Sequence, residues 1–186
     1  MSKKKSSIDI EAIVAKAQKG NEKSFVFLYD HFFDLIFRYV SFRVSPESRE
    51  DVVGDIFYKV VHNLKKYKQK PGASFKSWIY AIAHNQIIDF YRKQKELLGS
   101  DQIEENFFNK LPDKKGKKPD EHFIKKEETE TIKKALKKLS PIHREILELK
   151  FLEEFSNKEI SKIIGKTEGN IRIMQLRALR EIRKFF

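Results

Sequence analysis

Hydrophobic residues recur at helical spacing through most of the first 95 residues, and this periodicity constrains the fold more than any other feature. Four apolar stretches follow one another, separated at Gly20-Asn21, at Ser45-Pro46 and at Pro71-Gly72. Only 7 glycines and 5 prolines occur in 186 residues, so long helices are easily accommodated. No segment shows the alternation of apolar and polar residues that is typical of a strand. The sequence therefore predicts an all-α protein.

Each predicted helix carries one apolar face that needs a partner. Ser74 is placed to cap the fourth helix, and Ser48 with Asp51 has the spacing of a capping box at the third. The third helix is expected to bury Val52, Val53, Ile56, Phe57, Val60 and Leu64. Residues 1–95 are thus expected to form a small helical bundle.

Periodicity is lost between residues 96 and 126, where prolines and a glycine punctuate a highly charged segment. This composition predicts a flexible linker. Periodicity returns at Glu127, with helices expected to end near Leu139, to start again at Ser140-Pro141 and to extend through Leu152. The prediction is two small helical domains, residues 1–95 and 127–186, joined by a linker over residues 96–126.

The net charge of +12 is unevenly placed: +8 in residues 1–95, zero in 96–126 and +4 in 127–186. Two basic blocks suggest that the protein has two surfaces that contact one polyanion, although a surplus of charge can also serve solubility alone.

The absence of cysteine excludes disulfides and Cys-ligated zinc, and no cofactor or metal is expected. Neither a membrane-length apolar run nor a signal peptide is recognisable, which predicts a soluble cytoplasmic protein.

A helix-turn-helix is predicted between Ser156 and Arg183. Ser156 and Glu159 have the spacing of a capping box, Gly165 suits the tight turn, and Thr167 can cap the second helix. The outward face of that helix would present Asn170, Arg172, Ile173, Arg177 and Arg180. This layout is typical of DNA-binding proteins whose second helix enters the major groove. Two packed helices with a solvated basic face would give the same pattern.

Lysines alternate with aromatic residues before the fourth helix, where Tyr67 lies among Lys65, Lys66, Lys68 and Lys70. Basic groups beside aromatics and amides suit a single strand of nucleic acid whose bases are unstacked; a charged surface loop is the simpler alternative.

Asp51 and Asp55 lie four residues apart, with Glu50 beside them. A carboxylate pair can perform acid–base chemistry, but no nucleophile accompanies this one, so docking on a basic partner is favoured. We therefore expect a protein that is not an enzyme.

Five segments, taken in order, resemble the extracytoplasmic-function sigma factors. They are residues 20–29, 50–59, 75–92, 139–147 and 155–165. The resemblance implies a transcription initiation factor that binds core RNA polymerase, through its β′ clamp and β flap, and directs it to promoter DNA. It also implies an anti-sigma factor as a further partner, and membrane-bound anti-sigma factors are among those that the resemblance suggests.

The resemblance further implies roles for individual residues. Docking on the polymerase clamp would involve Glu50, Asp51, Asp55, Tyr58 and Lys59. Capture of the melted −10 element would involve Tyr67, Lys68, Lys70, Ser74, Asn85, Asp89 and Arg92. Reading of the −35 element would involve Thr167, Asn170, Arg172, Ile173, Leu176, Arg177 and Arg180. Many members of the family carry a small polar residue and an arginine where this chain has Ile173 and Met174, which favours a contact with a thymine methyl group.

Two other classes of protein fit parts of the pattern. A stand-alone helix-turn-helix regulator would use the N-terminal helices to sense a ligand or to dimerise. An anti-sigma or adaptor protein would only mimic the fold, and the intact basic face of the last helix argues against this alternative.

Overall fold

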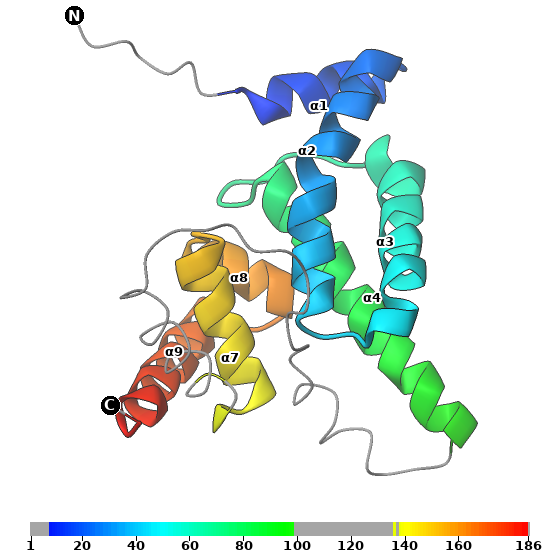
Figure 1. The fold of residues 1–186 in the computed structure, drawn as a ribbon. Coiled ribbons are helices and arrows are strands. Elements are labelled where there is room, and N and C mark those ends of the chain that lie inside the picture. Colours follow the sequence, from blue (N-terminus) through cyan, green and yellow to red (C-terminus); the bar gives the residue numbers. More distant parts are fainter. Residues whose placement is uncertain (1–7, 99–135, 137, 186) are drawn as a thin grey trace, which may run out of the picture.

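The computed structural model describes residues 8–98, 136 and 138–185, and every regular element in this part of the chain is helical. The elements are α1 (Ile10–Gln18), α2 (Glu22–Ser41), η1 (Pro46–Ser48), α3 (Arg49–Leu64), α4 (Phe75–Leu98), α7 (Pro141–Leu147), η2 (Glu148–Leu152), α8 (Asn157–Ile164) and α9 (Glu168–Arg183) (Figure 1). The all-α prediction is confirmed. No helix in the described ranges is both long and apolar enough to cross a lipid bilayer.

Short-range capping determines where several helices begin and end. The Asn21 side chain accepts from the backbone N–H of Ser24, and Gly20 turns the chain with a φ of 89°. The Ser74 hydroxyl accepts from the N–H of Ser77, as predicted for the start of α4. The predicted capping box at Ser48 is wrong: its side chain makes no cap bond because its backbone (φ −105°, ψ −1°) already lies in the helical region, at the end of η1.

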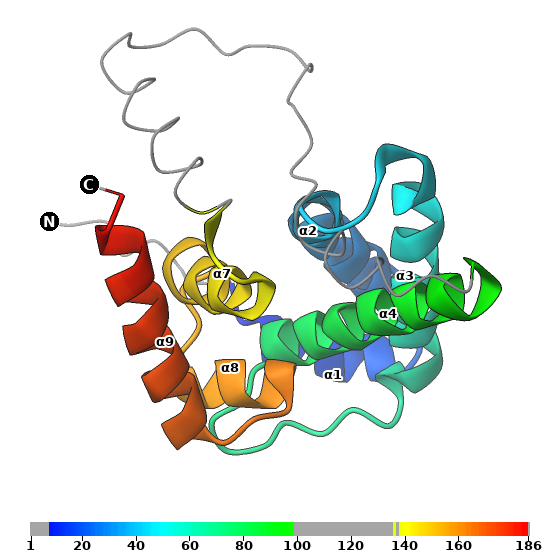
Figure 2. The ribbon, with the colours of Figure 1, turned by 90° about the horizontal axis from the view of Figure 1, so that it is seen from below.

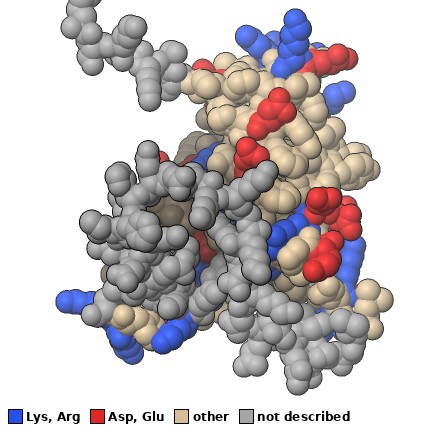
Figure 3. Space-filling view, viewed as in Figure 1, with Lys and Arg blue, Asp and Glu red and all other residues tan. Residues whose placement is uncertain are grey.

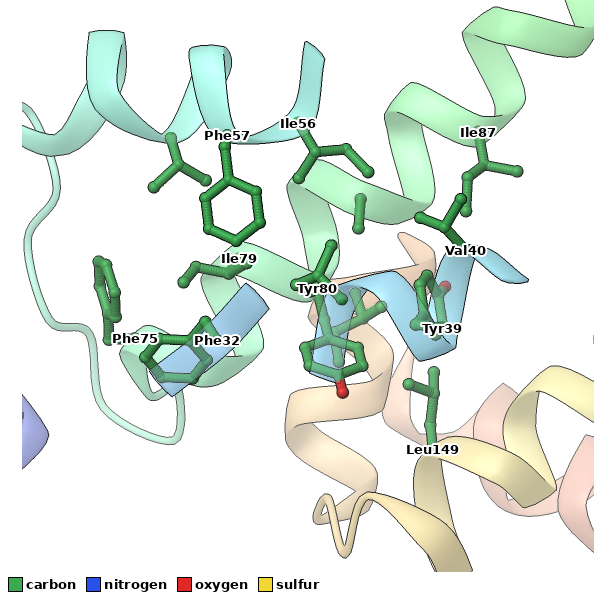
Figure 4. Close-up of a cluster of buried hydrophobic side chains, with 14 of the residues drawn as sticks. Phe32, Tyr39, Val40, Ile56, Phe57, Phe75, Ile79, Tyr80, Ile87 and Leu149 are labelled. Atoms are coloured by element: carbon green, nitrogen blue, oxygen red, sulfur yellow. The ribbon is translucent and has the colours of Figure 1, made fainter. Parts of the chain in front are cut away.

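Helices α1 to α4 enclose an aromatic-rich core. Phe32 and Ile36 of α2, Ile56 of α3, and Ile79 and Tyr80 of α4 are all at most 1% exposed. The side chains of Phe32, Ile56 and Ile79 converge between the three helices in Figure 4. Phe75 meets the ring of Phe32 edge to face, with 5.6 Å between centroids. Burial of this many large side chains is the main stabilising contribution to the first helical group.

The second helical group packs directly against the first. Helix α8 packs against α4, and α9 packs against both α7 and α8 (Figure 2). One continuous apolar cluster runs from Val14 through α4 to Ile171 of α9, and Leu149 points toward Tyr39 in Figure 4. Two helical groups are therefore present as predicted, but most of their buried apolar residues form one core. The predicted linker from residue 99 onward, and the predicted start of the second domain at Glu127, lie outside the described residues.

A wide helical turn changes which residues are buried after α7. Helix α7 passes into η2, where the N–H of Glu153 bonds the carbonyl of Glu148 five residues earlier. Such a π-type turn shifts the side-chain positions that follow it. Leu152, the last residue of the helix predicted from Ser140-Pro141, is 60% exposed, whereas Glu153 is 8% exposed.

Candidate nucleic-acid interface

The helix-turn-helix forms with the predicted local geometry. The Ser156 hydroxyl accepts from the N–H of Glu159, and the Glu159 carboxylate accepts from the N–H of Ser156. Gly165 has a φ of 71°, the left-handed conformation that glycine adopts without penalty. The Thr167 hydroxyl accepts from the N–H of Asn170 at the start of α9. These short-range contacts fix the angle at which α9 leaves α8.

Helix α9 presents a basic and apolar outer face. Ile171 and Ala178 are completely buried, whereas Ile173 and Leu176 are 50% and 57% exposed. The other exposed positions of the predicted reading face are Asn170, Arg172, Arg177 and Arg180. Arg172 pairs with Glu168 one turn earlier, at 2.7 Å, so DNA binding through this guanidinium would compete with an intrahelical ion pair. Basic side chains also gather around the far end of α9 in Figure 3.

A basic cleft lies where the loop after α3 meets α4. Its volume is about 700 Å³, and its lining includes Lys66, Lys68, Lys70, Tyr67 and Trp78. The Tyr67 ring packs against both Phe75 and Trp78, at centroid distances of 5.1 and 5.0 Å. The Tyr67 hydroxyl donates to Glu11, and burial, followed by the Glu11 charge, raises the pKa of Tyr67. Tyr67 thus forms a fixed wall of the cleft.

The remaining residues assigned to the −10 element extend from this cleft along α4. Trp78, Ile82, Asn85, Asp89 and Arg92 recur at intervals of three or four residues, which places them on one side of the helix. Asn85 and Arg92 are exposed. Asp89 pairs with Arg92 at 3.2 Å and with Lys59 of α3 at 3.6 Å. The cleft and this stripe together form a surface long enough to contact several nucleotides of a single-stranded nucleic acid.

The carboxylate face lies on α3. Glu50 and Asp51 are exposed in its first turn, and acidic side chains gather over this end of α3 in Figure 3. Tyr58, two turns further on, is 71% exposed. Asp55 accepts a hydrogen bond from Gln86 of α4 at 2.8 Å, so it also braces the two helices. This face combines negative charge with an exposed aromatic ring, which suits a basic protein partner.

Three contacts between the two helical groups, one of them at the cleft, were not anticipated from the sequence. Lys162 of α8 lines the cleft and donates to the carbonyl of Pro71 at 2.9 Å. The Ser74 hydroxyl donates to Glu159 at 2.7 Å. Lys76 pairs with Glu153 at 3.2 Å. These residues are 77 to 91 positions apart in the chain, so no local pattern could have revealed the contacts.

A buried polar network, also absent from the sequence prediction, lies deeper between the helical groups. Glu145 of α7 accepts hydrogen bonds from Tyr39 of α2 and from His84 of α4, the latter at 2.9 Å. Arg43 pairs with Glu148 at 2.5 Å. Burial alone would raise the pKa of Glu145, but the hydrogen bond from His84 and the charge of Arg43 outweigh it, and the pKa is lowered to about 2. Glu145 is therefore held as a carboxylate.

Comparison with known families agrees with this division into two helical groups. The model for sigma-70 region 2 matches residues 28–96, and a model for sigma-70 region 4 matches residues 129–182. The helical fold and the matches to these two regions place the chain in the class of sigma-70 transcription factors.

Similarity to individual sigma factors assigns the chain to one group within this class. The RNA polymerase sigma factor SigZ of Bacillus subtilis is 33% identical over 146 residues, covering 74% of this chain and 73% of SigZ. The ECF (extracytoplasmic-function) sigma factor BldN of Streptomyces coelicolor is 25% identical over 91% of this chain, which spans 63% of the length of BldN. The solved sigma factor RpoE from Bartonella quintana, in complex with the anti-sigma factor NepR, has a TM-score of 0.66 at 20% identity, over 88% of this chain and 96% of RpoE. The chain belongs to the extracytoplasmic-function group of RNA polymerase sigma factors.

Proposed function

We propose that this protein binds core RNA polymerase through α3, captures melted −10 DNA in the cleft beside α4, and reads the −35 duplex with α9. The observation that carries the proposal is the presence, in one chain, of a basic cleft with aromatic walls and a helix-turn-helix with an exposed basic face. The first suits unstacked single-stranded DNA and the second suits a major groove. Neither module contains a group of residues arranged for catalysis, and the chemistry would belong to the polymerase.

The proposed partners follow from the same surfaces and from the family. The carboxylate face of α3 would dock on the β′ clamp of the polymerase, and the second helical group would contact the β flap. The complex of RpoE with NepR supports proposing an anti-sigma factor as a further partner. The domains that carry these roles would be residues 1–95 and 127–186, with residues 96–126 linking them.

The rival assignment, a stand-alone regulator that senses a ligand, receives less support. It expects an apolar pocket inside the first helical group. The cavity enclosed by this group alone, lined by residues such as Leu28, Phe57 and Ile79, measures about 10 Å³, which is room for about one water molecule. A larger cavity of about 430 Å³ is not inside this group, because the second group supplies part of its lining.

In-vitro transcription tests the proposal. Core RNA polymerase would be assayed with and without this protein on a library of AT-flanked promoter candidates. We expect specific start sites that depend on the protein. Nanomolar binding to a palindromic duplex without polymerase, and no transcripts with it, would instead support the stand-alone regulator.

A substitution on α9 tests the −35 assignment separately. Arg177→Ala should weaken promoter binding by the holoenzyme by about 1–3 kcal/mol and relax selectivity at one base pair. Lys19→Ala removes the same charge from an exposed position after α1 and should leave selectivity unchanged. Equal selectivity in both variants would refute the assignment of Arg177.

A further inference from the structure

A cavity of about 430 Å³ lies where the two helical groups meet. Helices α2 and α4 contribute to its lining from the first group, and α7, the end of α8 and α9 contribute from the second; these helices can be followed in Figure 2. At about 30 Å³ for a group the size of a water molecule, the volume is room for roughly 14 such groups. Small-molecule sites in proteins measure about 300–1,000 Å³ and often lie between helices, so this cavity is large enough to be one.

The walls of the cavity are mostly aliphatic. Ile87 of α4 is 2% exposed, and Ile164 at the end of α8 is 9% exposed. Ile142 of α7 and Met174 of α9 are half-buried. Ile88, which is 43% exposed, also lines the cavity, so the cavity reaches the surface there. Such walls favour a hydrocarbon body, because a polar group facing them would lose its hydrogen bonds to water without replacement.

The polar end of the cavity holds a carboxylate with one unused oxygen. Glu145 lines the cavity and is 1% exposed. Its hydrogen bonds from Tyr39 and His84, and its ion pair with Arg43 at 3.9 Å, are all made by Oε1. Oε2 accepts no hydrogen bond from any residue in the described part of the chain. Because a buried carboxylate oxygen without a donor is unfavourable, Oε2 favours a bound molecule that supplies one.

A hydrogen-bond donor without an acceptor lies beside this carboxylate. Arg43 also lines the cavity, and its Nε–H makes no hydrogen bond within the described ranges, although its Nη2 pairs with Glu148 at 2.5 Å. The 3.9 Å between Nε and Oε1 of Glu145 places the unused donor and the unused acceptor on neighbouring groups. A hydroxyl group can serve both, because it donates one hydrogen bond and accepts others.

The charges around the polar end disfavour an ionised head group. A ligand carboxylate would be repelled by Glu145, which is held as a carboxylate. A ligand ammonium would be attracted to Glu145 but would lie beside the buried guanidinium of Arg43, and Lys166 adds a further positive charge to the lining. Burying an ion also costs more free energy than burying a neutral hydroxyl group. An uncharged head group therefore fits best.

We infer that this cavity is a binding site for a small apolar alcohol, with its hydroxyl group at Glu145 and its hydrocarbon body between Ile87, Ile142 and Ile164. The ligand would contact both helical groups, so neither group forms the site alone. The inference is independent of the proposed function, because the cavity shares no lining residue with the basic cleft or with the residues assigned to polymerase and promoter DNA.

Methyl NMR of the full-length chain tests this inference with two isomeric probes. The chain has two methionines, Met1 and Met174, and Met174 lines the cavity. A carbon-13 label on the methionine methyl groups therefore reports on the cavity, and Met174→Leu assigns the signal. Octan-1-ol and 1-methoxyheptane have the same atoms and the same length, but only the alcohol has a hydroxyl donor. We expect a saturable shift of the Met174 signal with octan-1-ol, and about tenfold or more weaker binding of the ether.

Three variants locate the binding on the protein. Ile142→Trp adds bulk to the lining, and Val26→Trp adds a similar bulk at a 54% exposed position of α2 outside it. Only the first should weaken binding of octan-1-ol about tenfold or more. Glu145→Gln offers an amide N–H in place of a carboxylate oxygen, so it should remove the preference for the alcohol, because the amide can donate to either probe. Circular dichroism would verify that each variant is folded.

Three results would overturn the inference. No shift of the Met174 signal in the wild type, up to the solubility limit of octan-1-ol, would show that the cavity takes only water. Equal affinity of the wild type for the two isomers would show that no hydroxyl group is recognised, and this comparison needs no variant. Undiminished binding to folded Ile142→Trp would place the alcohol elsewhere on the protein. These measurements involve neither polymerase nor DNA, so failure of the proposed function would leave their outcome unchanged.

Discussion

Glu145 is a buried residue whose charge should matter to stability. It is 1% exposed and lies between Tyr39, His84 and Arg43, which belong to or directly follow other helices. Glu145→Gln keeps the size of the side chain and one carbonyl oxygen but removes the charge. The variant therefore tests the ionised form of the network with little change in packing.

The expected magnitude follows from the pKa of Glu145, which is lowered from 4.5 to about 2. A difference of this size corresponds to about 3 kcal/mol of preference for the ionised carboxylate in the folded protein. Because the folded pKa is the lower one, this stabilisation is complete above pH 4.5 and is lost as the pH falls toward 2. At pH 7 the variant should therefore be less stable than the wild type by up to about 3 kcal/mol.

Urea unfolding followed by circular dichroism, at several pH values between 7 and 3, measures this difference. The gap between wild type and Glu145→Gln should narrow steadily below pH 4.5. Glu154→Gln, at an exposed carboxylate on the same segment, is the matched control and should follow the wild type. A gap that is constant across the whole pH range, or absent at pH 7, would refute the argument that the charge of Glu145 stabilises the fold.

Three further predictions concern single positions. Gly54 lies inside α3 with nothing within 4 Å of an added β-carbon, so Gly54→Ala should raise the free energy of unfolding by about 0.5–1 kcal/mol; an unchanged urea midpoint would contradict this. Gly165→Ala should lower it by about 1–2 kcal/mol, because a φ of 71° is unfavourable for alanine, and equal stability of the two alanine variants would refute the distinction. Asp51→Lys should abolish co-purification with core polymerase while Asp30→Lys, a reversal at an exposed position on α2, should not, and retention by both would refute docking through α3.

The sequence predicted the positions of the assigned site residues only where these positions follow from spacing along one helix or loop. The spacing of Asn170, Arg172, Ile173 and Arg177 sufficed to predict an exposed face on α9, because helical periodicity relates neighbouring positions directly. The alternation of lysine with Tyr67 drew attention to the loop that borders the cleft in the structure. It did not indicate that the Tyr67 ring packs against Phe75 and Trp78, since that depends on how the loop after α3 leads into α4.

The sequence by itself determined the helices and most of their ends, because a cap such as Ser156 with Glu159, or a turn at Gly165, involves residues within a few positions of one another. Tertiary structure alone decided how the two helical groups meet. Glu145 is 61 residues from His84 and 106 from Tyr39, and burying its charge is favourable only because both partners, with Arg43, converge on it. In the sequence the same glutamate looks like any polar position on a helix, since its stabilising partners are supplied by the packing of distant segments.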